Sequence, residues 1–343
     1  MPRELLLLAP RRVALCPFEP PPMTPHSVLL RTLFSGVSHG TEMLLYRGEA
    51  PKFQHNWDDR LRHFVPRGSE GNGRMPMGYE SVARVEQVGS DVEGLGPGDM
   101  IWLDAPHREV HVIDSRRPPP FWRLDDHADP RSLAFLALAR VALGAVHDAE
   151  PVLGGSAAVC GLGTVGQLCA QLLRRAGCRQ VFGIDPDPRR LAIAERSGMI
   201  PVPADSVDPA EFIKASMPGV DVGIEASGRY AGLASLLRCV APMGRLVVVS
   251  SYGNQSEGIA LGHEFHRNRI SVVSSMTMNG CAHPKAPLWT FERLTQEAAT
   301  LLTEQSVSVI PMITSVPFAS APEAYRTLEQ DAAPPLKILF AYE

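Results

Sequence analysis

The residues with the clearest chemical meaning are three glycines, Gly161, Gly163 and Gly166, followed by Asp185. A turn of the form Gly-x-Gly-x-x-Gly before a helix lets a pyrophosphate approach the backbone, where the first helical turn offers unpaired N–H groups. An acid at this spacing can accept hydrogen bonds from an adenosine ribose. The pattern therefore predicts a dinucleotide site. The alternative is that the glycines serve only a tight strand–helix turn.

The same region bears on the choice of cofactor. Thr164 and Val165 complete the turn and are counted with the glycines as cofactor-binding residues. Asp185 would repel a 2′-phosphate, so NAD is expected in preference to NADP. Arg189 and Arg190 follow closely, and either could fold back toward a phosphate, so NADP stays possible; we count Arg190 among the cofactor-binding residues.

Alternating strands and helices must position this site. Short apolar runs separated by helical patterns predict a doubly wound parallel sheet, the α/β fold called Rossmann. The expected strands are Ser156–Cys160, Val181–Ile184, Met199–Pro203, Val220–Glu225, Arg245–Ser250 and Ile270–Met276. The expected helices are Pro188–Ser197, Pro209–Ser216 and Tyr230–Val240, besides the one that opens at Gly163.

The rest of the chain has a different pattern. Residues 1–125 hold short β-like runs separated by proline and glycine, which predicts a compact β-rich domain. Pro51–Met77 reads as a long polar loop, either a mobile cover over a site or a solvated insertion. Pro130–Asp148 is expected to be one connecting helix. Residues 284–343 break the alternation and are expected to return to the first domain, which leaves the cofactor domain as an insertion.

Composition narrows the function classes. The chain has 343 residues, enough for two domains, and a net charge of −4, which gives no reason to expect a nucleic-acid partner. No apolar run approaches the ~18 residues of a membrane span. The six cysteines form no Cys-x-x-Cys pair, and several fall in apolar patterns. We therefore expect a cytoplasmic protein with reduced thiols.

Several motifs together resemble those of the medium-chain dehydrogenase/reductase superfamily, the alcohol dehydrogenase-like enzymes. They are Ser35 to Glu42 (SGVSHGTE), Gly78-Tyr79-Glu80, Gly96-Pro97-Gly98-Asp99, the glycine turn, and Asp221 to Gly228 (DVGIEASG). The resemblance implies a GroES-like catalytic domain at 1–127 and 284–343, a Rossmann domain at 128–283, and a homodimer. The motif form is most similar to the bacteriochlorophyllide dehydrogenase-like branch.

The chain departs from this family where zinc binds. The zinc enzymes carry a cysteine where Ser38 and His39 stand, and a histidine where Tyr79 stands. Their third ligand would fall near Ala137, and residues 17–159 lack the cysteines of the structural zinc lobe. Because zinc needs three or four N, S or O ligands around one point, no metal site is expected.

Without zinc, hydrogen-bond donors must handle the proton and the charge that develops on oxygen. Tyr79 is the first catalytic candidate because it replaces a metal ligand; it could equally be a ring that fills the vacated space. His39 is the second, because imidazole can relay a proton near pH 7, although a turn residue capping the backbone is as plausible. Ser38 could bond a substrate oxygen or relay to His39, although serines in turns usually bond the backbone.

These features predict a zinc-independent, NAD(P)-dependent oxidoreductase that moves hydride between a secondary alcohol or ketone and the cofactor. A large, partly apolar small molecule of specialised metabolism is the expected substrate. Two alternatives stay open: a reductase of activated carbon–carbon double bonds, as in quinone and enoyl reductases, and a dinucleotide-binding protein without catalysis.

Overall fold

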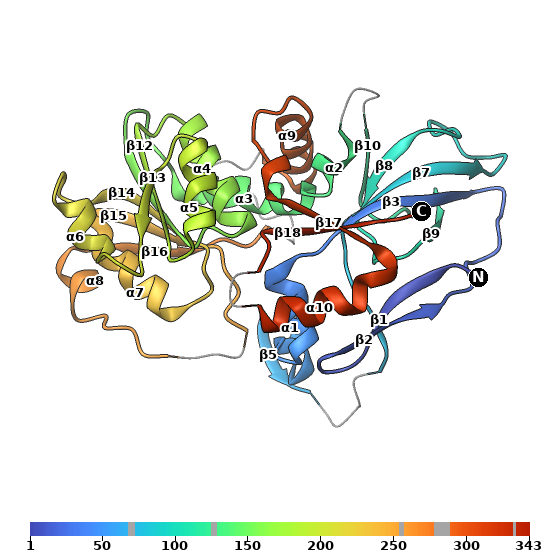
Figure 1. Cartoon of the computed structure of the whole chain (residues 1–343), viewed down its shortest axis with the longest axis horizontal. Helices are drawn as coiled ribbons and strands as arrows, with labels where there is room; N and C mark the ends of the chain where they lie inside the picture. The colour runs from blue at the N-terminus through green and yellow to red at the C-terminus, as the bar shows by residue number, and fades with distance from the viewer. Residues whose placement is uncertain (68–72, 125–128, 254–256, 278–288, 332–333) are drawn as a thin grey trace. The chain divides into compact units, whose positions relative to one another are not determined.

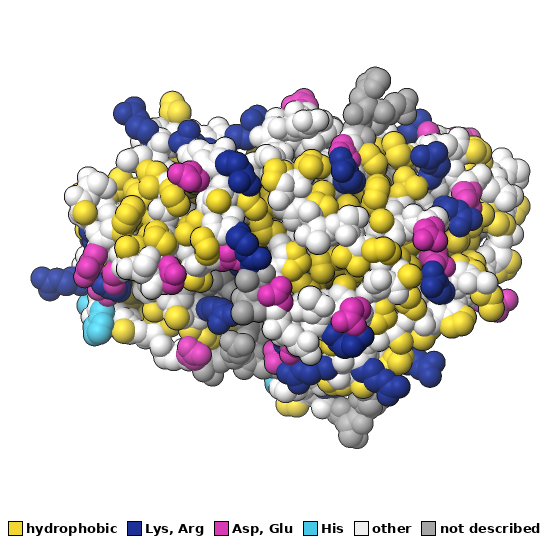
Figure 2. All heavy atoms as spheres, in the orientation of Figure 1, with side chains coloured by type: hydrophobic (Ala, Val, Ile, Leu, Met, Phe, Trp, Pro, Cys, Tyr) yellow, Lys and Arg dark blue, Asp and Glu magenta, His cyan; other side chains and the backbone are white. Residues whose placement is uncertain are grey.

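The computed structural model describes residues 1–67, 73–124, 129–253, 257–277, 289–331 and 334–343. The chain divides into two compact units, Met1–Phe135 with Ile313–Glu343, and Leu136–Met312. In the described residues no helix is long and apolar enough to cross a membrane. Basic and acidic side chains lie intermixed on the face drawn in Figure 2.

The second unit is built on a six-stranded parallel sheet, as predicted. The strand order is β13-β12-β11-β14-β15-β16, and every neighbouring pair is parallel. The strands are β11 Ser156–Cys160, β12 Gln180–Asp185, β13 Ile200–Pro203, β14 Val220–Glu225, β15 Val240–Val248 and β16 Ser271–Ser274. The helices are α3 Leu136–Ala149, α4 Thr164–Arg175, α5 Pro188–Arg196, α6 Pro209–Lys214, α7 Tyr230–Cys239, α8 Glu264–Arg267 and α9 Phe291–Thr303, with a 3-10 helix η2 at Ile310–Met312.

The sheet reverses its winding direction beside β11. The chain runs from β11 outward through β12 and β13, then returns to place β14, β15 and β16 on the other side. Helices α4 and α5 lie beside this sheet (Figure 1). Ala158, Phe182 and Leu246 belong to one buried core with helices α6 and α7. Ligands of such sheets bind at the carboxyl ends of the strands beside this reversal.

The first unit is rich in antiparallel β-structure. Its largest sheet runs β10-β8-β7-β3-β18-β17, with β9 also paired to β3; smaller sheets are β2-β1-β6 and β4-β5. The strands are β1 Arg3–Ala9, β2 Arg12–Pro17, β3 Ser27–Gly36, β4 His55–Asp58, β5 His63–Pro66, β6 Met75–Pro76, β7 Ser81–Val88, β8 Met100–Leu103, β9 Val110–Asp114, β10 Phe121–Arg123, β17 Ile313–Pro317 and β18 Lys337–Ala341. The helices are α1 His39–Arg47, α2 Pro130–Leu133 and α10 Ala321–Gln330, with 3-10 helices η1 Pro51–Phe53 and η3 Phe318–Ser320.

Three expectations differ from the structure. The helix expected at 130–148 is broken, since α2 ends at Leu133 and α3 begins at Leu136; the Phe135 N–H donates instead to Ser132 O at 3.1 Å, a tight turn. The segment 51–77, expected as a loop, forms a 3-10 turn and a hairpin in its described part. The units divide at 135/136 and 312/313, not at 127/128 and 283/284.

The second boundary between the two units, at 312/313, lies later in the chain than expected because α9 packs on α3. Arg140 of α3 donates to Thr295 of α9 at 3.2 Å, and the guanidinium of Arg140 lies 3.9 Å from the ring centre of Phe291. The His147 ring lies 4.3 Å from that of Trp289. Helix α9 is therefore anchored to α3 within the second unit.

Candidate functional site

The three glycines of the turn after β11 have different structural roles. Gly161 has φ +90°, and a Cβ there would lie 2.5 Å from Ser227 Cα. A Cβ on Gly166 would lie 1.8 Å from the carbonyl oxygen of Gly161. At Gly163, by contrast, a Cβ would meet no heavy atom within 4 Å. Two glycines are therefore required by packing, whereas the third keeps an open space in front of the helix.

The start of α4 carries no side-chain cap, unlike the starts of α5 and α6; the start of α7 also has none. Asp187 caps α5 and Asp208 caps α6, each accepting a backbone N–H at 2.9 Å. Helix α4 begins at Gly163 with no side-chain cap. Its first turn, which holds Thr164 and Val165, therefore has no capping side chain, and the helix dipole favours an anion there. This geometry fits a phosphate group.

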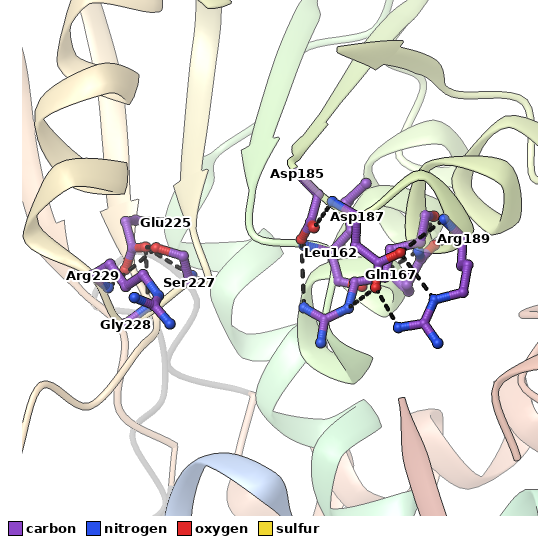
Figure 3. A network of polar contacts seen from close by, with 10 residues as sticks. Leu162, Gln167, Asp185, Asp187, Arg189, Glu225, Ser227, Gly228 and Arg229 are labelled. Carbon is purple, nitrogen blue, oxygen red and sulfur yellow. Dashed lines mark hydrogen bonds and ion pairs between the residues drawn. The ribbon is translucent and has the colours of Figure 1, made fainter. Parts of the chain in front are cut away.

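Asp185 ties the glycine turn to the end of β12 (Figure 3). Its buried carboxylate accepts the Leu162 N–H at 2.7 Å and the Asp187 N–H at 2.9 Å. Arg190 Nη1 lies 3.6 Å from Asp185 Oδ2, and Arg190 Nε lies 3.6 Å from Asp187 Oδ2. Since a carboxylate offers about four acceptor sites, Asp185 keeps capacity for a ribose hydroxyl. Arg190 lies beside this carboxylate, so Asp185 and Arg190, both predicted from the sequence to bind the cofactor, lie next to each other.

A second buried carboxylate ends β14, on the other side of the winding reversal (Figure 3). Glu225 accepts the N–H groups of Ser227 at 2.7 Å and Gly228 at 3.2 Å, and the Tyr252 hydroxyl at 2.8 Å. Burial and the charge of Glu225 raise the pKa of Tyr252. No role for Glu225 is predicted from the sequence, although its position at the end of a buried strand could have marked it. The Glu225 carboxylate therefore fixes the loop at Ser227 and Gly228, against which Gly161 packs.

In the first unit, Ser38 and Tyr79 are brought together. The side chains of Ser38 and Thr41 lie close enough to the Tyr79 phenol for hydrogen bonding from them to act on its pKa. Burial raises the pKa of this phenol, the charges of Glu80 and Glu42 raise it as well, and the bonds from Ser38 and Thr41 lower it, with a net rise. The phenol therefore keeps its proton at neutral pH. The sequence analysis did not single out Thr41.

The proton of Tyr79 is available to a third partner. A phenol oxygen accepts hydrogen bonds and also carries one O–H donor. The O–H of this neutral phenol can therefore be donated to an oxygen placed beside it. His39 lies half-buried at the first position of α1, beside Ser38 in the chain.

The segment that carries Tyr79 is anchored from behind. Glu80 is fully buried and forms an ion pair with the fully buried Lys337 of β18. The ammonium of Lys337 lies 5.3 Å from the ring centre of Phe135. The Gly36 N–H donates to Glu80 O at 3.0 Å. Glu80 therefore has a structural role, because its carboxylate anchors this segment to β18.

The donor set does not fit zinc. At the positions that the family resemblance gives to metal ligands stand Ser38 with His39, Tyr79, and Ala137, which lies buried in α3 and offers no side-chain donor. Glu80 is committed to Lys337. Within the described residues, no group of three or more His, Cys, Asp or Glu side chains could hold a metal ion.

Comparisons with known proteins agree with this architecture. The family model described as "Zinc-binding dehydrogenase" matches residues 164–291. D-guloside 3-dehydrogenase of Escherichia coli is 29% identical over 335 residues, covering 94% of this chain and 95% of the relative. These comparisons support the medium-chain dehydrogenase/reductase superfamily. They also support an enzyme of the NAD(P)-dependent dehydrogenase type.

Solved structures share the fold over the whole chain. The 2R,3R-butanediol dehydrogenase of Bacillus subtilis superposes with a TM-score of 0.78 at 19% identity, covering 99% of both chains. A putative zinc-binding dehydrogenase of Sinorhizobium meliloti bound to NADP gives 0.77 at 18% identity, again covering 99% of both. The prediction of a Rossmann sheet with a GroES-like β-rich domain is thereby confirmed.

Proposed function

We propose that this chain is a zinc-independent, NAD(P)-dependent dehydrogenase that interconverts a secondary alcohol and its ketone on a polyol or sugar derivative. The observation that carries the proposal is the uncapped start of α4 behind an open Gly163, with Asp185 at the neighbouring strand end. The relatives named for guloside and butanediol favour a hydroxyl-rich substrate over the larger apolar one expected from the sequence.

The dinucleotide would be held by groups of the second unit. The first-turn N–H groups of α4 would bind its pyrophosphate, and Asp185 would bind a ribose hydroxyl. When bound, the nicotinamide supplies hydride transfer. Asp185 favours NAD, whereas Arg190 keeps NADP within reach because its guanidinium lies beside the same carboxylate.

Tyr79 would handle the proton in the first unit. A phenol that keeps its proton at neutral pH can donate to a ketone oxygen as negative charge develops there. In the oxidation direction its raised pKa makes it a poor base. His39, whose imidazole titrates near neutral pH in model peptides, is the candidate to take the proton away from the site.

The test is a spectrophotometric panel at the nicotinamide absorbance band. Purified protein is offered NAD or NADP with polyols, glycosides and vicinal diols, and NADH or NADPH with ketones, enones and quinones. We expect turnover with at least one member of the first set. Metal analysis should find no stoichiometric zinc in the purified protein, and treatment with a chelator should leave the activity unchanged. Activity on enones alone would assign a double-bond reductase. No turnover with tight cofactor binding would assign a binding protein.

A further inference from the structure

Ser38 is an N-cap residue that does not cap its helix. A serine at this position usually accepts an N–H from the first turn. Here Ser38 makes no side-chain cap bond, and its side chain lies near the Tyr79 phenol, on whose pKa it acts. The helix start is secured in another way, because Glu42 Oε1 accepts the Ser38 backbone N–H at 2.7 Å. Glu42 thus leaves the Ser38 hydroxyl free for Tyr79.

Glu42 is held by side chains from distant parts of the first unit. It is fully buried, and Oε2 accepts from the Tyr325 hydroxyl and faces His107 Nε2 at 3.1 Å. Burial raises the pKa of the Glu42 carboxyl, but the charge of His107 and the bonds from His107, Ser38 and Tyr325 lower it to a net value below its ordinary one. A buried carboxylate is tolerated when it is paired and hydrogen-bonded in this way.

His107 completes the cluster and also contacts the Tyr79 segment. Its Nδ1 lies 2.7 Å from Ser35 Oγ, which lies 2.7 Å from the Tyr342 hydroxyl. A Cβ at Gly78 would lie 2.6 Å from the His107 ring, so His107 packs on the backbone just before Tyr79.

From these contacts we propose that Glu42, His107 and Tyr325 are positioning residues that set the Ser38 hydroxyl against the Tyr79 phenol. The cluster reaches Ser38 through a backbone N–H, and a backbone N–H cannot relay a proton. Its role is therefore to hold two backbone segments, the start of α1 and the turn at Gly78, in register. The inference rests on the proposed function of Tyr79 as proton donor.

The experiment compares Glu42→Gln and Tyr325→Phe with a matched control, Glu329→Gln. Glu329 also ties α1, through Arg47 at 2.6 Å, but at the other end of the helix. On the substrate that gives turnover, we expect both cluster variants to lose at least about tenfold in kcat while NADH affinity stays unchanged, and the control to keep both. The loss should be non-additive with Ser38→Ala, because both changes break the same Ser38–Tyr79 contact.

Hydrogen exchange gives a readout that does not depend on turnover. The Ser38 amide should exchange at least about tenfold faster in Glu42→Gln than in the wild type or in Glu329→Gln, since its acceptor is weakened. Additive kcat effects, or an unchanged exchange rate at Ser38, would overturn the inference. A wild-type protein that is inactive on every substrate would contradict only the proposed function. The exchange rate at Ser38 would still decide whether Glu42 secures the start of α1.

Discussion

At the residue scale, the three glycines of the turn after β11 differ in whether the structure has room for a side chain. Gly161 and Gly166 are pressed against backbone, whereas Gly163 faces open space. A packing explanation accounts for the first two glycines but not for the third. A ligand that needs room in front of α4 accounts for the third.

Gly163→Val should therefore lose dinucleotide binding and keep the fold. The branched side chain would occupy the space that a pyrophosphate needs, and no protein atom lies within 4 Å to clash with its Cβ. We expect affinity for NADH to fall by at least about a hundredfold, on the order of 3 kcal/mol, in a fluorescence titration, with an unchanged circular dichroism spectrum. Gly166→Val is the contrast and should fail to fold. Unchanged affinity in Gly163→Val would move the phosphate site elsewhere.

Asp185 should make the protein bind NADH more tightly than NADPH. A 2′-phosphate ~4 Å from this carboxylate would cost ~1–4 kcal/mol, depending on the effective dielectric. Arg190 offsets part of that cost, since it lies 3.6 Å from Asp185. Asp185→Asn should narrow the preference for NADH over NADPH, while Asp208→Asn, which alters the cap of α6 and has no contact with Arg190, should leave this preference unchanged. Calorimetric titration of both cofactors measures this, and tighter binding of NADPH by the wild type would refute the assignment.

Tyr79→Phe should lower turnover much more than it weakens cofactor binding. The change removes the hydroxyl that Ser38 and Thr41 hold and keeps the ring. If the O–H donates to the substrate oxygen in the transition state, kcat should fall by ~10²–10⁴-fold. The measurement is single-turnover kinetics where hydride transfer limits the rate. A near-normal rate would pass the proton role to His39.

At the element scale, local patterns predicted the second unit well. All six strands of the parallel sheet and helices α5, α6 and α7 lie where apolar runs, proline starts and capping acids indicate them. The break between α2 and α3 was missed, since neither Ala134 nor Phe135 is a glycine or proline that would mark a helix end. The hairpin in the segment expected as a loop was also missed, because its Trp57 and Phe64 strands are short and exposed.

The catalytic candidates show the same limit. Ser38 and Tyr79 were found because a family pattern marks their positions. Their support was not, because Glu42 meets His107 across 65 residues and Tyr325 across 283. No periodicity or spacing reports contacts at such separation. Only the folded chain shows that one carboxylate gathers three donors.

Strand β9 should make folding sensitive to pH through His111. Burial, then the charges of Arg108 and His107, lower the pKa of His111 to about 3. The unfolded chain binds a proton below about 6.5 while the folded chain does not, so stability should fall as pH drops from about 6.5, by up to roughly 1.4 kcal/mol per pH unit. Urea unfolding at pH 5, 6 and 7 measures the slope. His111→Gln should flatten it, the exposed His63→Gln should not, and equal slopes in all three proteins would contradict the prediction.

At the scale of the whole molecule, the free edge of the parallel sheet is the feature that remains to be explained. β16 pairs only with β15 among the described residues. Ser271, Val272 and Ser274 are exposed on it, and Val272 keeps 41% of its surface accessible. Beside it, Leu261 is 55% exposed and lines the same groove as Val272. An exposed β-branched edge with apolar neighbours invites pairing with another chain.

We predict that two copies pair through β16 to give a homodimer with a continuous sheet. An isologous contact of this kind places each strand against its own two-fold mate, so one substitution acts twice. Val272→Lys should place like charges opposite one another and shift the protein to monomer at micromolar concentration, whereas Val207→Lys, an exposed valine in the loop before α6, should not. Light scattering coupled to size-exclusion chromatography measures the mass. A wild type with the mass of one chain at that concentration would reject the pairing, and a dimer untouched by Val272→Lys would place the contact on another surface.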